Sequence, residues 1–541
     1  MKKTGLFIFL TLGSIAYCQK DLPKIIIGVV VDQMCYDYLN RFGSNFSQNG
    51  FNKIINEGAH LKNMHYNYIP TYTGPGHASI YTGTTPDHHG IIANDWIQRE
   101  TKSQVNCVGD PKVYGIGSNS LNGQSSPHRL NKKTITDMLK ETYPKSKVVS
   151  VSIKDRGAIL PGGQKSDGSY WFDYTNGTFI TSSFYKNELP CWLNKFNKKN
   201  NAQSYAKVWE PLLNPEAYSA EDDSPYERIL RGKTKPIFPY DIKQLCDISG
   251  SLTPFTTSPF ANTLLTDLAL RAIKKENLGK GSSPDMLCIS YSSPDIAGHA
   301  FGPDSKEIED MYIRLDLELA RLLNSLEHSY GKSNILLFLT ADHGVVPVPQ
   351  KLIDDGEKGG YVFIDQLINE LRNKSINAFG VDFILGQDNL NIYLDYQKIA
   401  SSGLEKEDIL NLLALNIEGK KGIKQSAKGK QLEKLETEDG LLKMLSKGFY
   451  PSRSGDLLLI LEHGYLPKSS LSMEPFKGTS HGSGYAYDTH VPCLWYGMDI
   501  EKIEITRRLA ITDISTTLSQ ILKLKKGQET GTEIKELISA E

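Results

Sequence analysis

The fold is decided by a short apolar run, IIIGVVVD at residues 25–32, which ends on a carboxylate. Three further runs of β-branched and other apolar residues follow it along the chain, at 148–153, 286–291 and 335–339. Continuous apolarity, rather than alternation with polar residues, is typical of strands that are buried on both faces of a parallel sheet. We therefore expect these four runs to be neighbouring core strands.

Helical patterns separate the apolar runs. The clearest covers residues 304–328, where apolar side chains recur on one stripe, and Asp304 with Glu307 resembles a capping box at its start. Strands that alternate with helices predict an α/β fold, in which a central, mainly parallel sheet is flanked by helices. Two long polar stretches, at about 157–260 and 356–477, are expected to be insertions or cap regions around this single core.

Charged or metal-binding side chains follow each apolar run directly or within a few residues. They are Asp32 after the first run, Lys154 and Arg156 after the second, Asp295 after the third, and Asp342 and His343 after the fourth. In open parallel sheets, ligands bind beyond the carboxyl ends of the strands. Four strand ends that each deliver such a residue predict one polar site at that edge of the sheet.

Six carboxylate and imidazole side chains form a candidate metal-binding set: Asp32, Asp295, His299, Asp342, His343 and His481. Oxygen and nitrogen donors without a thiolate suit zinc in a catalytic site. Asp295 and His299 are four residues apart, which places both on one face of a helix. Each residue alone also fits a structural role, such as Asp32 capping a turn, so the prediction rests on the six together.

A Gly-Pro-rich turn, TYTGPGH at residues 71–77, is the second candidate for chemistry. Two glycines and a proline let the backbone turn sharply and bring its amides near an anion. Residues 78–81 are expected to form a short helix whose positive end favours phosphate. The hydroxyl of Thr73 becomes a candidate nucleophile if a metal lowers its pKa. Without the six candidate ligands, the same stretch reads as an ordinary turn.

These stretches, taken together, resemble the alkaline phosphatase superfamily, and most closely its PafA-type periplasmic alkaline phosphatases. The blocks that carry the resemblance lie at residues 31–34, 71–77, 89–96, 152–156, 293–299, 340–344 and 478–482. They occur in the same order as in that family and extend from residue 25 to beyond residue 480. The resemblance therefore covers essentially all of the chain after its N-terminal segment, and it implies an alkaline phosphatase-like core.

The resemblance also implies two zinc ions per chain and a role for each candidate residue. The first zinc ion would be bound by Asp295, His299 and His481. The second would be bound by Asp32, Asp342, His343 and the hydroxyl oxygen of Thr73. Thr73 would attack phosphorus and form a phosphothreonine. The phosphate oxygens would be held by Asn94, Lys154 and Arg156.

The implied function is hydrolysis of small-molecule phosphomonoesters. The main alternative is a phosphodiesterase or nucleotide pyrophosphatase of the same superfamily, which shares the threonine nucleophile and two zinc ions. A diester carries one fewer charged oxygen, so the cations of Lys154 and Arg156 favour a monoester. A sulfatase is disfavoured because Thr73 cannot become formylglycine. A more remote alternative is a periplasmic metal- or phosphate-binding protein without activity, for which a nucleophile at Thr73 would be unnecessary.

The N-terminal segment predicts export. Lys2 and Lys3 precede an apolar run at 6–15 that is too short to cross a bilayer comfortably, so residues 1–18 are expected to be a cleaved signal peptide and residues 19–541 one catalytic domain. This places the protein in the periplasm or outside the cell. Lipid attachment at Cys18 is disfavoured because the preceding Tyr17 is bulky.

The overall charge gives no reason to expect nucleic acid or an anionic membrane as a partner. The formal net charge is -1, from 61 basic and 62 acidic residues. Stable membrane insertion after signal cleavage is not expected, and a monomer is compatible with the sequence. Six cysteines follow residue 18 and would allow up to three disulfides, with the pairing left open. None lies in a Cys-x-x-Cys pair, and Cys288 falls in an apolar run typical of a core residue.

Overall fold

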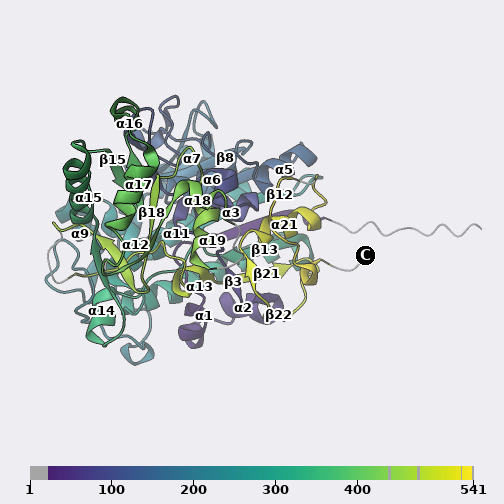
Figure 1. Ribbon diagram of the computed structural model, residues 1–541. Helices are drawn as coiled ribbons and strands as arrows, with labels where there is room; N and C mark the ends of the chain where they lie inside the picture. The colour runs from purple at the N-terminus through teal and green to yellow at the C-terminus, as the bar shows by residue number, and fades with distance from the viewer. Residues whose placement is uncertain (1–21, 436–439, 472–475, 526, 539–541) are drawn as a thin grey trace, which may run out of the picture.

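The computed structural model describes residues 22–435, 440–471, 476–525 and 527–538. The predicted signal peptide at 1–18 lies outside this part of the chain. A ten-stranded mixed sheet forms the centre of the molecule (Figure 1). Its strand order is β22 (Ile503–Ile505), β2 (Ala59–Leu61), β21 (Cys493–Gly497), β13 (Ile335–Thr340), β1 (Ile25–Val31), β12 (Asp285–Tyr291), β7 (Val148–Ser152), β8 (Gly168–Asp173), β9 (Thr178–Ser182) and β6 (Gly115–Ile116).

The four predicted strands are β1, β7, β12 and β13, and they lie side by side. β1 pairs in parallel with β12 on one side and with β13 on the other, and β12 pairs in parallel with β7. Every residue of these four strands is buried, as continuous apolarity predicts. Antiparallel pairing begins only at β21 and β9. The predicted α/β fold with a mainly parallel central sheet is therefore confirmed.

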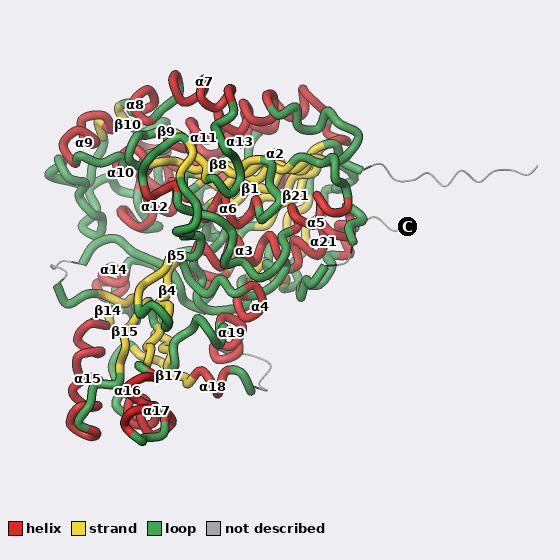
Figure 2. Tube along the Cα trace, turned by 90° about the horizontal axis from the view of Figure 1, so that it is seen from above, coloured by secondary structure: helices red, strands yellow, loops and turns green. Residues whose placement is uncertain are grey.

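Helices cover both faces of the sheet. Figure 2 shows α11 (Phe260–Lys275) and α13 (Lys306–Tyr330) on one side, and α3 (Thr73–Thr82), α5 (Ile135–Thr142), α6 (Asp155–Gly162) and α21 (Asp513–Ile521) on the other. The longest, α13, is the helix expected at 304–328. Its predicted capping box is wrong, because the cap is Ser305, whose hydroxyl accepts from the backbone N–H of Ile308 at 3.2 Å. Asp304 instead pairs with Arg41 at 3.0 Å.

A smaller sheet lies beside this core, at the lower left of Figure 2. It contains the four antiparallel strands β15 (Ile384–Asp388), β16 (Asn391–Leu394), β18 (Leu457–Leu461) and β17 (Ile423–Lys428). With α15 (Ile364–Phe379), α16 (Tyr396–Ser402) and α17 (Lys406–Leu415) it encloses a hydrophobic cluster of its own. The other long polar stretch, at about 157–260, contributes two strands, β8 and β9, to the main sheet.

The six cysteines in the described part of the chain are unpaired, and Cys288 is a buried residue of β12. None of the described helices combines the length and the apolar character that crossing a membrane requires.

Gly28 fixes how closely α3 approaches the central strand. A Cβ atom at this position would lie 2.5 Å from the hydroxyl oxygen of Tyr81 and 2.7 Å from the ring of Phe338. Both neighbours are fully buried and have little room to move. We expect Gly28→Ala to lower the free energy of unfolding by about 1–3 kcal/mol, the usual cost of overpacking a core, measured by urea denaturation. The matched control is Gly43→Ala, whose Cβ would meet nothing within 4 Å; equal midpoints for the two variants would contradict this account of the core.

Candidate active site

Thr73 is the first residue of α3, and it is buried. The helix expected at 78–81 therefore begins five residues earlier than predicted. The preceding Tyr72 has extended backbone geometry, so the chain turns into the helix at Thr73 itself. The N–H of Gly74 donates to Asn94 Oδ1 at 2.7 Å. Since this bond uses the carbonyl oxygen of Asn94, the amide N–H groups of Asn94 remain free to donate to an anion beside Thr73.

Gly76 lets α3 approach the strand ends. A side chain there would collide with the backbone carbonyl and the Cβ atom of Asp342. The N-terminus of α3 is thereby held directly against the turn that follows β13. Its partial positive charge faces the carboxylates of that turn and favours any anion bound beside them.

Asp32, Asp342 and His343 form the first of two candidate metal-binding groups. All three are fully buried, and their donor atoms lie within 4.8 Å of one another. His343 Nδ1 donates to the backbone carbonyl of Gly344 at 2.9 Å, so in the neutral ring Nε2 is a free electron-pair donor. This Nε2 lies 3.4 Å from Asp32 Oδ1 and 3.4 Å from Thr73 Oγ1. The candidate nucleophile therefore adjoins this group.

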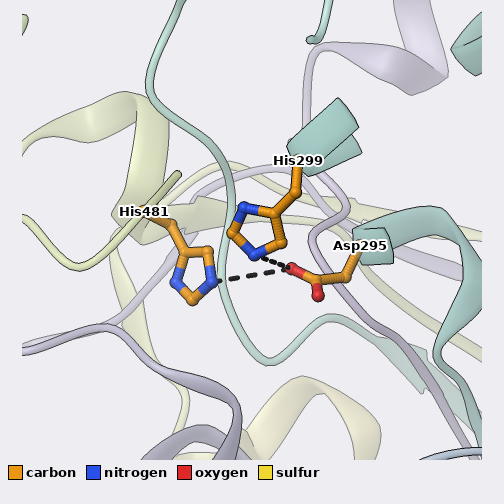
Figure 3. A group of neighbouring side chains, drawn as sticks. All are labelled: Asp295, His299 and His481. Carbon is orange, nitrogen blue, oxygen red and sulfur yellow. Dashed lines mark ion pairs between the residues drawn. The ribbon is translucent and has the colours of Figure 1, made fainter. Parts of the chain in front are cut away.

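Asp295, His299 and His481 form the second group, shown in Figure 3. Asp295 and His299 lie one turn apart on α12 (Ser293–Phe301), as their spacing predicted. His299 Nδ1 donates to the carbonyl of Thr479 at 2.9 Å, and His481 Nδ1 donates to that of Thr71 at 2.8 Å. Both rings turn Nε2 toward Asp295 Oδ1, at 3.2 Å and 3.5 Å. Anchoring of the outer ring nitrogen by a carbonyl is the usual arrangement for metal-binding histidines.

The two groups carry more negative charge than their surroundings balance. Asp32 Oδ1 and Asp342 Oδ2 are buried and accept no hydrogen bond from any residue that the structure describes. Burial, and then repulsion by Asp342, raises the pKa of Asp32 well above its ordinary value. The stacked rings of His343 and His481, with centroids 3.5 Å apart, both have lowered pKa values, chiefly because of burial. Neutral imidazoles beside unpartnered carboxylate oxygens are a donor set that fits bound metal cations.

Lys154 lies between the two groups. It directly precedes α6, and its Nζ atom is 2.6 Å from Asp32 Oδ2 and 2.6 Å from Asp295 Oδ2. The same atom is 3.5 Å from Thr73 Oγ1. Burial by itself lowers the pKa of Lys154, but the charges of Asp295 and Asp32 outweigh it, and the net shift is upward. Lys154 is therefore a fixed positive charge beside the candidate nucleophile.

Arg156 supplies a second cation from the first turn of α6. One of its terminal nitrogens lies 3.6 Å from Asp155 Oδ1, and its buried Nε atom has no hydrogen-bond partner among the described residues. The structure thus brings together Asn94, Lys154, Thr73 and both candidate metal-binding groups. Arg156 is the second residue of α6, two positions after Lys154.

Gln33 and His77 were missed by the sequence analysis. Gln33 has a positive φ of 66°, its backbone N–H donates to Asp342 Oδ1 at 3.1 Å, and its Nε2 donates to Asp295 Oδ1 at 2.6 Å. It therefore holds one carboxylate of each group. His77 Nδ1 lies 2.9 Å from the carbonyl of Thr73 and 3.3 Å from Asp342 Oδ2. The available signal was position, since both residues stand in blocks that carry the family resemblance.

Comparison with known proteins agrees with this geometry. The sequence profile of the type I phosphodiesterase / nucleotide pyrophosphatase family matches residues 26–484. The chain belongs to this family. It is 38% identical over 511 residues to alkaline phosphatase PafA of Elizabethkingia meningoseptica, covering 93% of this chain and 92% of that protein. It is also 36% identical over 543 residues to a calcium-transporting ATPase of Myroides odoratus, covering 99% and 98% of the two chains.

The family match extends to three-dimensional structure. The crystal structure of wild-type PafA superposes with a TM-score of 0.91 at 36% identity, covering 96% of this chain and 99% of that chain. The expected membership of the alkaline phosphatase superfamily is confirmed, as is the prediction that the chain is an enzyme.

The position of Gln33 yields a test of metal binding that does not require activity. Gln33→Met keeps the length of the side chain but removes the donor to Asp295. We expect metal binding by the Asp295–His299–His481 group to weaken about 10–100-fold, as when other outer hydrogen-bond partners of metal ligands are removed. The measurement is bound metal during competition with a chelator. The control is Gln366→Met, at an exposed position of α15, and identical chelator curves for the two variants would rule out this positioning role.

Proposed function

We propose that the chain is an alkaline phosphatase that hydrolyses phosphate monoesters through a covalent intermediate on Thr73. The observation that carries this proposal is the fixed positive charge of Lys154, 3.5 Å from Thr73 Oγ1, with Arg156 two residues further along the chain. A monoester presents a dianionic phosphoryl group with one substituent. A diester presents one negative charge and two substituents, so it gains less from two cations and needs more room.

The names of the relatives support a singly substituted phosphoryl group as substrate. One relative is named an alkaline phosphatase and the other an ATPase. The terminal phosphoryl group of ATP, like that of a monoester, carries one substituent. The family profile is described as phosphodiesterase and nucleotide pyrophosphatase, which makes diester hydrolysis the second candidate. A monoester and a diester differ in the number of charged oxygens and of substituents on phosphorus. The two cations, Lys154 and Arg156, favour the monoester.

We propose that the two residue groups hold two zinc ions, one in each group. The Asp32–Asp342–His343 group would share its ion with Thr73 Oγ1. Zinc fits these oxygen and nitrogen donors, and when bound it would lower the pKa of a hydroxyl or water and offset negative charge on the phosphoryl oxygens. The lowered pKa values of His343 and His481 and the unpartnered oxygens of Asp32 and Asp342 among the described residues support this assignment.

The side chains around Thr73 have separable tasks in the proposed reaction. Thr73 Oγ1 gives up its proton to solvent and attacks phosphorus in line with the leaving group, whose oxygen–phosphorus bond breaks as the new bond forms. The departing oxygen takes a proton from solvent and leaves as the alcohol. Asn94, Lys154 and Arg156 hold the phosphoryl oxygens during this transfer. Water then attacks the phosphothreonine from the side that the alcohol vacated, and inorganic phosphate leaves while Thr73 regains its proton.

We also propose how the chain is exported and divided into regions. Residues 1–18 would direct the chain to the periplasm or out of the cell, and residues 19–541 would form one catalytic domain. The smaller sheet, within about 356–477, would belong to a cap region around the core. The Lys102–Asp395 pair at 3.0 Å and the Arg99–Asp456 pair at 3.1 Å support a fixed attachment of this sheet to the core.

The deciding experiment compares kcat/KM for a monoester and a diester with the same aryl leaving group. We expect the monoester to be preferred. Replacing both cations, Lys154→Ala with Arg156→Ala, should lower monoester hydrolysis at least about 100-fold, the cost of losing one such electrostatic contact, and diester hydrolysis far less. The control is Lys165→Ala, which changes an exposed lysine three residues after the end of α6. An equal loss on both substrates, with bound metal unchanged, would contradict the monoesterase assignment.

A further inference from the structure

A second set of acidic side chains is buried away from the candidate active site. Glu307 lies in the first turn of α13 and is 0% exposed. Glu227 is 1% exposed and lies in the irregular segment between the 3-10 turn Pro215–Ala217 and β11 (Tyr240–Asp241). Asp222, in the same segment, is half-buried. Burial raises the pKa of Tyr240, and the negative charges of Glu307, Glu227 and Asp222 raise it further.

Most of the oxygens of the two glutamates have no partner. The hydroxyl of Tyr240 donates to Glu307 Oε1 at 2.6 Å. Glu307 Oε2 and both carboxylate oxygens of Glu227 are buried and accept no hydrogen bond from any described residue. Burying a carboxylate without such compensation costs several kcal/mol. Three such buried oxygens, on two carboxylates whose charges act on each other, call for a ligand that is positively charged.

Two other carboxylates on α13, those of Glu309 and Asp310, do have hydrogen-bond donors. Asp310 accepts from Trp209 Nε1 at 2.6 Å and from Tyr218 at 2.6 Å, and it pairs with Arg314 at 2.7 Å. Glu309 accepts from the N–H and the hydroxyl of Ser219, both at 2.9 Å. The fold therefore supplies donors to the two carboxylates that follow Glu307 on α13, whereas Glu307 Oε2 and both oxygens of Glu227 have none among the described residues.

The charges of the pair interact strongly. Burial, followed by the charge of Glu307, raises the pKa of Glu227 to about 10, and burial raises the pKa of Glu307 to about 8. Lys477 and Lys306 are the cations that oppose these shifts, and neither donates a hydrogen bond to the free oxygens of Glu227 or Glu307 within the described residues. Within the described part of the chain, the pair is therefore not neutralised by a directly bonded cation.

We propose that Glu227 and Glu307 bind a calcium ion, with Asp222 at the rim of the site. The free donors are all carboxylate oxygens, which hard cations prefer, and among the described residues no histidine or cysteine forms a metal-binding group with them that would favour zinc. Glu227 offers both oxygens, and bidentate carboxylates suit calcium. Magnesium demands a near-octahedral site and keeps several of its waters, which a pair of nearly fully buried glutamates does not favour.

A cation here would brace the backbone that supports His299. The N–H of Arg228 donates to the carbonyl of Ala300 at 2.9 Å, and that of Gly478 donates to the carbonyl of Tyr226 at 2.8 Å. The segment that carries Glu227 is thus bonded both to α12 and to the loop that leads to Thr479, the acceptor for His299. Calcium would join this segment to the start of α13 without touching the candidate zinc ligands.

Terbium luminescence tests the proposal on the full chain with zinc present in fixed excess. Tb³⁺ replaces calcium at oxygen sites and emits when nearby aromatic rings absorb, and Tyr240 lies 5.6 Å from the ring of Trp209. We expect sensitised emission from the wild type that calcium displaces, and at least about tenfold weaker binding for Glu227→Gln or Glu307→Gln, since affinity follows the number of charged ligands. Glu309→Gln, whose carboxylate is fully partnered, should bind as the wild type does.

Thermal unfolding gives a second readout. Calcium should raise the Tm of the wild type and of Glu309→Gln through its binding to the folded state, and it should leave that of Glu227→Gln unchanged. Without calcium, Glu227→Gln should be at least as stable as the wild type, because it removes an unpartnered buried acid. Emission that calcium does not displace, or equal calcium responses of wild type and Glu227→Gln, would overturn the proposal.

Discussion

Negative charge at the ends of the central strands is the constraint on which the site depends. Asp32 and Asp342 follow adjacent parallel strands and Asp295 follows a third, and all three carboxylates are buried in one place. Such an arrangement is stable only if cations balance it. Lys154 balances part of the charge through two contacts of 2.6 Å. The remaining oxygens, with three histidines fixed by backbone carbonyls, form the two groups that fit metal ions.

The same electrostatic requirement links structure to the proposed chemistry. A site built to hold cations against buried carboxylates also attracts a phosphoryl dianion, and the N-terminus of α3 adds a further positive end beside Thr73. The family profile by itself points to phosphodiesters. In the proposed function, a monoesterase within that family would differ by the cations beside the non-bridging oxygens, and Lys154 and Arg156 would be those cations.

Much of this was predictable from sequence because the signals were local. Four unbroken apolar runs predicted β1, β7, β12 and β13, and the residues after them predicted where the ligands would meet. Three features were not predictable. Gln33 adopts a positive φ that no pattern around it indicates. The start of α3 at Thr73 depends on Gly76 packing against Asp342. Glu227 lies in an irregular segment, and its lack of partners is a property of the folded chain alone.

The cap of α13 shows the limit of spacing rules. Asp304 and Glu307 have the separation of a capping box, yet Ser305 caps the helix. Asp304 forms an ion pair with Arg41, and Glu307 is buried against Tyr240. Long-range partners, which a single sequence does not reveal, decided the roles of both acids.

The covalent role of Thr73 is the central claim, and direct detection of its phosphorylated form is the most direct test. The enzyme would be mixed with an aryl phosphate, quenched in acid within the first turnover, digested, and analysed by mass spectrometry. The account predicts that the peptide containing Thr73 gains the mass of one phosphoryl group, and that Thr73→Ala gains none while still binding metal. Phosphorylation of another residue, or full turnover by Thr73→Ala, would contradict it.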